Sequence, residues 1–197
     1  MFDVLKVAYE KDPALKKGLS FIEVIFYPGV QAIILYRIAH RLHGIGIPVI
    51  PRAISYFARF LTGAEIHPAA KIGRRFFIDH ATGVVIGETA EIGDNVMLFH
   101  QVTLGGHGWW RDQKGDKRHP TLEDNVTVGV GATILGPVTI KKNSRIGAMT
   151  LIVDDIPENS TVVCEKGKIR IREGETIKYR DPCETCDQIC FKDKTPK

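Results

Sequence analysis

The chain has 197 residues, of which 44% are hydrophobic and 25% are charged. That balance is ordinary for a globular protein and excludes wholesale disorder. No stretch approaches the roughly 18 uninterrupted apolar residues of a membrane-spanning helix. The net charge of +4 is too small to indicate nucleic-acid binding, but it is compatible with an anionic small ligand. The N-terminus lacks the order of basic, apolar and small residues that a signal peptide has, so we expect a cytoplasmic protein.

The first 63 residues are predicted to be helical. The helices that we expect cover 2–10, a stretch that opens at Pro13, 30–42 and 52–61. Asp12 precedes a proline, which disfavours the helical conformation, so Asp12 marks a boundary where it can cap the second helix. Pro28-Gly29 separates the second helix from the third, and Gly63 closes the fourth.

From Glu65 onward, aliphatic residues recur every six positions. The series runs through Ile66, Ile72, Ile78 and Val84, then, after a shift of two, through Ile86, Ile92, Leu98 and Leu104, and finally through Leu122, Val128, Ile134, Ile140, Ile146 and Ile152. Neither an α-helix nor a single-face strand produces this period, whereas a β-helix of hexapeptide units does. Each unit is expected to form a short strand and a turn, with one inward aliphatic side chain stacked on its equivalent in the next coil. About fourteen units predict four to five triangular coils.

Residues 105–121 interrupt the repeat with glycines, two tryptophans and two histidines. The frame survives, because Leu104 and Leu122 are eighteen residues apart. Irregular loops on a rigid scaffold are where function concentrates. We therefore predict an α+β protein with a helical region (1–63), a β-helix (64–163) that carries this loop excursion, and a C-terminal tail (164–197).

Histidines are candidates for acid–base chemistry, because the imidazole ordinarily titrates near working pH. His80 follows Asp79 at the surface end of a coil, and His119 follows Arg118 at the end of the loop excursion. Glu65 precedes His80 by fifteen residues, near one coil length, so it is placed to accept a hydrogen bond from the imidazole. For each of these residues, a solvated surface position is the plainer alternative.

Several short motifs are more specific than the period of the repeat. They are Asp12-Pro13-Ala14, Tyr36-Arg37 with His40, Glu65-Ile66-His67-Pro68-Ala69-Ala70-Lys71-Ile72-Gly73, Asp79-His80-Ala81-Thr82-Gly83, Ile86-Gly87-Glu88-Thr89-Ala90, Val102-Thr103-Leu104-Gly105-Gly106 and Arg118-His119-Pro120. Together they resemble the serine O-acetyltransferase family, from about Asp12 to Ile152. The hexapeptide repeat alone is typical of many acyltransferases, whereas the Asp-His-Ala-Thr-Gly and Arg-His-Pro motifs narrow the resemblance to the serine O-acetyltransferases.

The resemblance implies a left-handed parallel β-helix that transfers acetyl from acetyl-CoA to the hydroxyl of L-serine, the first step from serine to cysteine. It implies that His80 is the general base, with Glu65 in the place of a carboxylate partner that is usually aspartate. The residues implied to hold serine are Asp12 and Asp79 for its ammonium group, Arg118 for its carboxylate and His119 for its orientation. Acetyl-CoA is the cosubstrate, and neither a metal nor another cofactor is expected.

Acetyl-CoA is expected in the groove between adjacent β-helices, because the family works as a trimer with active sites between subunits. The positions expected to contact it are Gly106, Gly131, Arg145 and Ala148, with backbone N–H groups near Gly106 as candidates to stabilise the oxyanion. The resemblance also implies feedback inhibition by L-cysteine and a homotrimer, with a hexamer as the runner-up. Many members end in isoleucine, which docks into the sulfhydrylase that uses O-acetylserine. This chain ends in Thr195-Pro196-Lys197, so a sulfhydrylase partner is doubtful.

The C-terminal cysteines are not explained by the resemblance. Cys183, Cys186 and Cys190 have a spacing at which thiolates can converge on zinc or an iron–sulfur cluster, with a fourth ligand from Cys164 or another chain. Reduced thiols on a mobile tail are the alternative.

Three other functions stay open at this stage. One is acetyl transfer to another small hydroxyl acceptor, such as a sugar. A second is a γ-type carbonic anhydrase, in which His80, His119 and His100 bind zinc between subunits. The third is a non-catalytic β-helix scaffold.

Overall fold

The computed structural model describes residues 2–11, 23–108, 115–164, 169–173 and 176–180. The chain divides after Val162 into two units, the second of which contains an antiparallel hairpin of β15 (Ile169–Glu173) and β16 (Thr176–Arg180). The helix predicted from Pro13, the substrate candidate Asp12 and the three tail cysteines lie outside the described residues. Within the described ranges, no helix is both long and apolar enough to cross a membrane.

Helices come before the strands, as predicted. They are α1 (Phe2–Lys11), the 3₁₀ turn η1 (Val24–Phe26), α3 (Pro28–Gly44) and α4 (Ile50–Thr62). Both α3 and α4 begin two residues earlier than predicted, because a proline in the first turn costs no intrahelical hydrogen bond. Gly63 ends α4 in the left-handed conformation, at φ +75°, and donates its N–H to the carbonyl of Arg59 at 2.8 Å.

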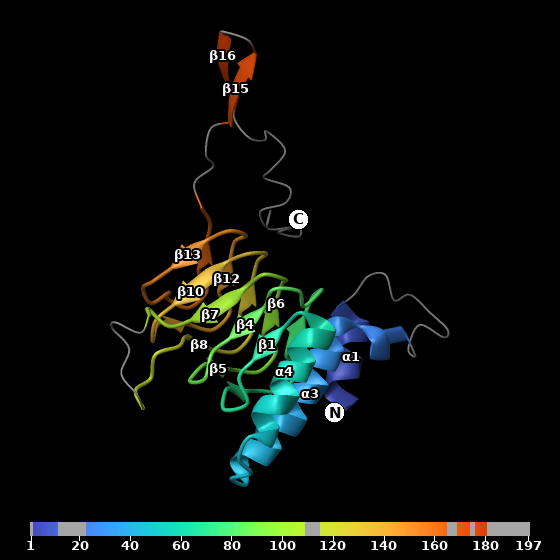
Figure 1. Ribbon diagram of the computed structural model, residues 1–197. Coiled ribbons are helices and arrows are strands. Elements are labelled where there is room, and N and C mark those ends of the chain that lie inside the picture. Colours follow the sequence, from blue (N-terminus) through green and yellow to red (C-terminus); the bar gives the residue numbers. More distant parts are fainter. Residues whose placement is uncertain (1, 12–22, 109–114, 165–168, 174–175, 181–197) are drawn as a thin grey trace, which may run out of the picture. The chain divides into compact units, whose positions relative to one another are not determined.

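The strands of the first unit are two or three residues long and wind into a β-helix with three parallel sheets (Figure 1). They are β1 (Glu65–Ile66), β2 (Lys71–Ile72), β3 (Phe77–Ile78), β4 (Val85–Ile86), β5 (Glu91–Ile92), β6 (Met97–Leu98), β7 (Thr103–Gly105), β8 (Thr121–Leu122), β9 (Thr127–Val128), β10 (Thr133–Leu135), β11 (Thr139–Ile140), β12 (Arg145–Ile146), β13 (Leu151–Ile152) and β14 (Thr161–Val162). Sheet A has the order β1-β4-β7-β10-β13, sheet B has β2-β5-β8-β11, and sheet C has β3-β6-β9-β12-β14. The predicted β-helix is confirmed.

The predicted aliphatic residues form the core, in one column behind each sheet. The columns are Ile66, Ile86, Leu104, Ile134 and Ile152 in sheet A, Ile72, Ile92, Leu122 and Ile140 in sheet B, and Ile78, Leu98, Val128 and Ile146 in sheet C. A second buried residue lies two positions earlier in most units, and the prediction of one inward residue per unit missed it. Examples are Ala64, Ala70, Phe76, Ala90, Val96, Val102, Val126 and Ala132.

Val84 belongs to this second set and not to a strand column. Counting six from Ile78 placed it in a strand, but β4 begins at Val85, and it is Ile86 that stacks on Ile66. The corner at His80-Ala81 is the cause, since both residues have positive φ (64° and 59°) and lengthen the first coil to the twenty residues between Ile66 and Ile86. The shift of frame in the sequence therefore marks a wider corner.

An asparagine ladder runs along the corner between sheets B and C. The side-chain amide of Asn95 donates to Asn125 at 2.8 Å, Asn125 donates to Asn143 at 3.2 Å, and Asn143 donates to Asn159 at 2.9 Å. All four residues have φ near +60°. Asparagine suits this corner because it tolerates the left-handed conformation and its amide both donates and accepts.

The helices contact the first coil through specific hydrogen bonds. Side chains of α3 and α4 donate to its carbonyl groups: Tyr36 to Ala70 at 2.5 Å, His40 Nδ1 to Pro68 at 2.7 Å and Ser55 to Ile66 at 2.6 Å. Burial raises the pKa of Tyr36 to about 12, so its phenol keeps the proton that it donates.

An ion-pair network joins α1 to α3 and the β-helix. Asp3 receives two hydrogen bonds from the Arg37 guanidinium, at 2.7 and 2.9 Å, and one from the backbone N–H of Arg75 at 3.3 Å. The Arg75 guanidinium in turn donates to Glu10 at 2.7 Å. The hydrogen bond from Arg37 holds the pKa of the Asp3 carboxyl well below its usual range.

Candidate functional site

His80 lies at the corner between sheets C and A, directly after β3. Its side chain is 74% exposed, and Oδ1 of Asp79 lies 3.7 Å from its Nε2. The ring of His100, from the next coil, meets the His80 ring edge-on, with 5.7 Å between centroids and an angle of 82°. His100 is partly buried, and its Nδ1 has no hydrogen-bond partner among the described residues. This corner therefore presents an accessible imidazole beside one carboxylate.

Two of the positions expected to contact acetyl-CoA lie further along the same corner. Gly131, at φ +65°, donates its N–H to the carbonyl of His100 at 3.1 Å. Ala148 is exposed in the following coil, where the next residue, Met149, is the equivalent of Gly131 and donates its N–H to the carbonyl of Val130 at 2.8 Å. Arg145 is exposed on β12 of sheet C, and Gly106 directly follows β7 of sheet A.

Arg118 and His119 lie at the other edge of sheet A, at its corner with sheet B. They face Glu88 and Thr89 of the preceding coil. The Arg118 guanidinium forms an ion pair with Glu88, and its backbone N–H donates to the Thr89 hydroxyl at 3.0 Å. His119 is 8% exposed, and its Nδ1 accepts the backbone N–H of Thr89 at 3.1 Å. This corner holds a guanidinium and a buried imidazole in fixed positions.

Gly87 makes room for the His119 ring. A Cβ atom at this position would lie 1.9 Å from Cδ2 and 2.1 Å from Nε2 of His119. No side chain fits at that distance, so the glycine in the Ile-Gly-Glu-Thr motif is required by the packing of the histidine.

Glu65 is held by arginines of α4. Its carboxylate accepts a hydrogen bond from Arg59 at 2.7 Å and lies 3.6 Å from Arg52, and within the described chain it forms no hydrogen bond or ion pair with His80. The fifteen-residue separation is shorter than the first coil, so the residue that faces Glu65 in the next coil is Val85. The role of Glu65 beside the base stays a prediction.

The two histidine corners are separate within one chain. They flank sheet A on opposite sides, and no hydrogen bond, ion pair or ring contact joins His80 or Asp79 to Arg118 among the described residues. The described side chains also contain no group of three histidine, cysteine, aspartate or glutamate residues that could hold a metal ion. In a single chain, His119 therefore does not join His80 and His100 in the ligand set of a carbonic anhydrase.

Two cavities lie along the corner between sheets A and B, and the first of them adjoins the Arg118–His119 segment. One, of about 310 Å³, is lined by residues that include Glu88, Thr89 and Lys117. The other, of about 450 Å³, lies between the link from α3 to α4 and His67-Pro68. Burial lowers the pKa of His67, and the positive charge of Arg52 acts in the same direction.

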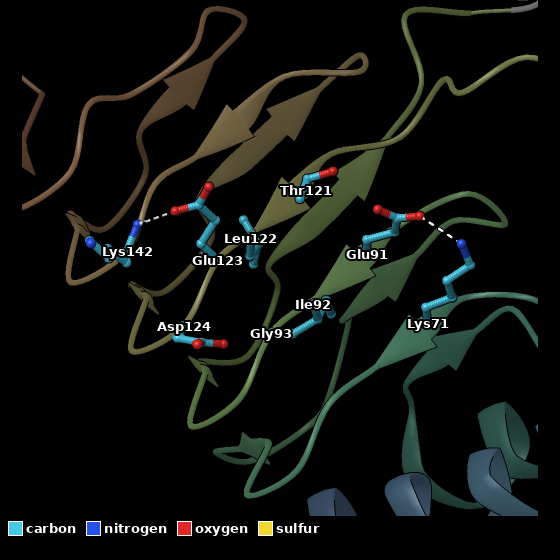
Figure 2. Close-up of a pocket in the computed structure, with 9 residues that line it drawn as sticks. All are labelled: Lys71, Glu91, Ile92, Gly93, Thr121, Leu122, Glu123, Asp124 and Lys142. Carbon is cyan, nitrogen blue, oxygen red and sulfur yellow. Dashed lines mark hydrogen bonds and ion pairs between the residues drawn. The ribbon is translucent and has the colours of Figure 1, made fainter.

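A third cavity, of about 370 Å³, lies on the outer face of sheet B and contains none of the predicted site residues (Figure 2). Its charged groups are paired with one another or with neighbours. Lys71 lies 2.9 Å from Glu91, and Lys142 donates its backbone N–H to Glu123 at 2.9 Å and lies 3.1 Å from Glu158. Paired surface charges of this kind are ordinary on a β-helix and do not indicate a ligand.

Sequence reasoning missed Glu88 and Thr89 as site residues, and it named His100 only as a possible zinc ligand. For the first two, a signal was present. Leu122 stacks on Ile92, so Arg118 and His119, which precede Leu122 by four and three residues, correspond to Glu88 and Thr89, which precede Ile92 by four and three. Applying the coil register to the loop residues would have paired them.

The chain resembles known proteins over most of its length, although no protein-family model matches it. A serine acetyltransferase of Bacillus licheniformis is 51% identical over 173 residues, which cover 87% of this chain and 77% of that protein. A serine acetyltransferase of Helicobacter pylori is 48% identical and is matched over 92% of its own length. The chain belongs to the serine acetyltransferase family. The resemblance inferred from the Asp-His-Ala-Thr-Gly and Arg-His-Pro motifs is confirmed.

Solved serine acetyltransferase structures support the same fold. The enzyme of Neisseria gonorrhoeae in complex with serine has a TM-score of 0.76 and 38% identity, over 83% of this chain. Isoform 3 of Entamoeba histolytica in complex with cysteine also has a TM-score of 0.76 and 38% identity, over 86% of this chain. The chain spans 65% and 58% of these two chains, respectively, which is less than two thirds of each. The predicted helical region followed by a left-handed parallel β-helix is the fold of these serine acetyltransferases.

Proposed function

We propose that this chain transfers the acetyl group of acetyl-CoA to the hydroxyl of L-serine, giving O-acetyl-L-serine and CoA, the first step from serine to cysteine. The observation that carries the proposal is the identity of about one half with serine acetyltransferases, combined with an exposed His80 and a fixed Arg118–His119 pair. The serine complex of the Neisseria gonorrhoeae enzyme supports the choice of acceptor.

Serine is a small zwitterion, and the site residues provide a base for its hydroxyl and a charged partner for each of its two ionic groups. His80 takes the proton of the serine hydroxyl as its oxygen attacks the thioester carbonyl carbon. The C–S bond then breaks, and the CoA thiolate leaves and recovers the proton. Asp79, with its carboxylate beside His80, holds the serine ammonium group, and Arg118 holds the serine carboxylate.

The separation of the two corners supports a site between copies of the chain. His80 and Asp79 act on the hydroxyl and the ammonium group, and Arg118 and His119 on the carboxylate, yet these pairs flank opposite edges of sheet A. A molecule as small as serine needs both pairs at once, so a neighbouring copy supplies the second pair. A homotrimer satisfies this requirement for all three sites.

Acetyl-CoA follows the corner that carries His80. Gly131 and Ala148 lie along that corner in successive coils, and the exposed side chain of Met149 packs against Gly131 between them. Arg145 lies exposed on the adjacent face, and its guanidinium is a suitable hydrogen-bond donor to the phosphates of acetyl-CoA.

L-cysteine is expected to compete with serine. The two amino acids differ by one atom, and isoform 3 of the Entamoeba histolytica enzyme is known in complex with cysteine. The groups proposed to hold the ammonium and carboxylate of serine would hold those of cysteine equally well, which provides feedback inhibition by the end product.

A thiol-release assay tests the proposal. The full chain is incubated with acetyl-CoA and one acceptor at a time, and the release of CoA is followed. The acceptors are L-serine, L-threonine, L-homoserine and a hexose. We expect release with L-serine, and a loss of at least about a hundredfold in kcat for His80→Ala. No release with L-serine would defeat the assignment, and faster release with another acceptor would change the substrate.

A further inference from the structure

Thr89 makes four hydrogen bonds to the Arg118–His119 segment. Its hydroxyl oxygen accepts the backbone N–H groups of Arg118 and His119, at 3.0 and 3.1 Å. The same oxygen lies 2.9 Å from Nδ1 of His119, and the backbone N–H of Thr89 donates to that nitrogen at 3.1 Å. One residue therefore fixes both the backbone and the ring of the segment that faces it.

These contacts define the state of the His119 ring. A backbone N–H can only donate, so Nδ1 has to accept with its lone pair. The Thr89 hydroxyl already accepts two N–H groups, which leaves its own hydrogen as the donor toward the same nitrogen. A neutral imidazole carries a single N–H, and with Nδ1 as acceptor that hydrogen is on Nε2.

Burial makes this arrangement rigid. His119 is 8% exposed, and Gly87 packs so closely on the ring that even a Cβ atom would overlap it. A flip of the ring, which would put Cδ2 in the place of Nδ1, would break both contacts of that nitrogen with Thr89 and is opposed by this close packing.

We propose that Thr89 is a positioning residue that locks His119 as the Nε2–H tautomer and ties it to Arg118 in one unit. This half of the site then donates hydrogen bonds to its ligand and takes no proton from it, which leaves proton abstraction to the exposed His80. The identity of the ligand rests on the proposed function, whereas the lock itself rests on the contacts of Thr89 and on the packing of the His119 ring.

The lock is tested by ¹⁵N nuclear magnetic resonance on the full chain labelled at its histidine rings, at pH 7.5. His119→Gln identifies the His119 signals by their disappearance. We expect one pattern, that of a neutral ring protonated on Nε2. A ring protonated on Nδ1, or on both nitrogens, would overturn the proposal whether or not the enzyme acetylates serine.

The consequence for binding is tested with two variants of Thr89. Thr89→Val keeps the shape and removes the hydroxyl, and we expect it to raise the KM for serine about tenfold or more, since it removes hydrogen bonds that fix Arg118 and His119. The KM for acetyl-CoA is expected to stay within about twofold of wild type. Thr89→Ser keeps a hydroxyl at this position, and its KM for serine is expected to lie within about threefold of wild type. If Thr89 served only to fill space, serine would be a poorer replacement than valine. Wild-type serine KM in a folded Thr89→Val variant would contradict the positioning role.

Discussion

Gly87 and His119 meet across the corner between sheets A and B, thirty-two residues apart in the chain. The space for a Cβ atom at Gly87 is already filled by the ring. The backbone conformation does not require glycine here, because Gly87 does not have a positive φ. The glycine therefore serves the neighbouring histidine and not a turn of its own.

Gly87→Ala is expected to displace the His119 ring and to raise the KM for serine more than about tenfold, while the chain still folds. Gly44→Ala is a matched control, since no described residue apart from its neighbours in the chain would lie within 4 Å of a Cβ atom there. Steady-state kinetics and circular dichroism on both variants provide the measurement. Equal serine KM values for the two variants would show that the ring tolerates the extra methyl group.

At this scale, sequence reasoning identified His80, Arg118 and His119 by their motifs but not the residues that hold them. Hydrogen-bonding types such as Thr89 occur throughout a hexapeptide repeat, so type alone does not separate Thr89 from Thr103 or Thr121. What distinguishes Thr89 is the residue stacked above it, and that depends on coil register.

The coils are the elements of this fold, and the asparagine ladder shows how neighbouring coils are held in register. Each of the first three amides in the ladder donates to the asparagine of the next coil, and all four asparagines have a left-handed backbone conformation. The two contributions can be separated by substitution at Asn125, which lies inside the ladder.

Asn125→Ala is expected to lower the free energy of unfolding by about 2 kcal/mol, through the lost hydrogen bonds and the strain of a positive φ. Asn125→Gly removes the same hydrogen bonds, but glycine adopts the left-handed conformation without strain. We therefore expect its free energy of unfolding to fall by only about 1 kcal/mol. Urea unfolding of both variants checks the difference. If alanine and glycine cost the same, corner strain does not contribute.

The pairing of α1 with α3 is expected to depend on pH. The native pKa of Asp3 is lowered, mainly by its hydrogen bond with Arg37, so its stabilisation is present above the ordinary pKa of an aspartate and is lost as the pH falls below it. At pH 7, Asp3→Asn should cost about 1 kcal/mol. Urea unfolding at pH 7 and pH 3.5 should show a smaller difference from wild type at the lower pH. A difference that grows toward low pH would contradict the assignment.

Element boundaries followed from the sequence where a single residue type decides them, as Gly63 does at the end of α4. The repeat predicted every strand column except where the corner at His80-Ala81 adds two residues. The second buried set was hidden because it mixes alanine, valine and phenylalanine, and small residues give no periodic hydrophobic signal.

For the whole molecule, the main question is how copies combine. The proposed site takes His80 from one copy and Arg118 from its neighbour, which gives a test by subunit mixing. His80→Ala and Arg118→Ala are each expected to be inactive at moderate serine concentration. In mixed assemblies, some sites would combine the intact His80 of an Arg118→Ala chain with the intact Arg118 of a His80→Ala chain.

We expect activity to reappear when the two inactive variants are dissociated together and reassembled, to a minor fraction of the wild-type value. Each variant taken through the same procedure alone is the control. Light scattering on the wild type should give the mass of three chains. No recovery from mixed assemblies of that mass would place both residues in one chain and contradict the shared site.

The hydrogen bonds from α3 and α4 to the first coil have a consequence for solubility. A stack of parallel coils ends in a row of open backbone groups, onto which the last coil of another molecule could add. Tyr36, His40 and Ser55 occupy the carbonyl groups of Ala70, Pro68 and Ile66 at that end. The helices thus cap the first coil and block the addition of another molecule's last coil, which would otherwise extend the β-helix head to tail into fibres.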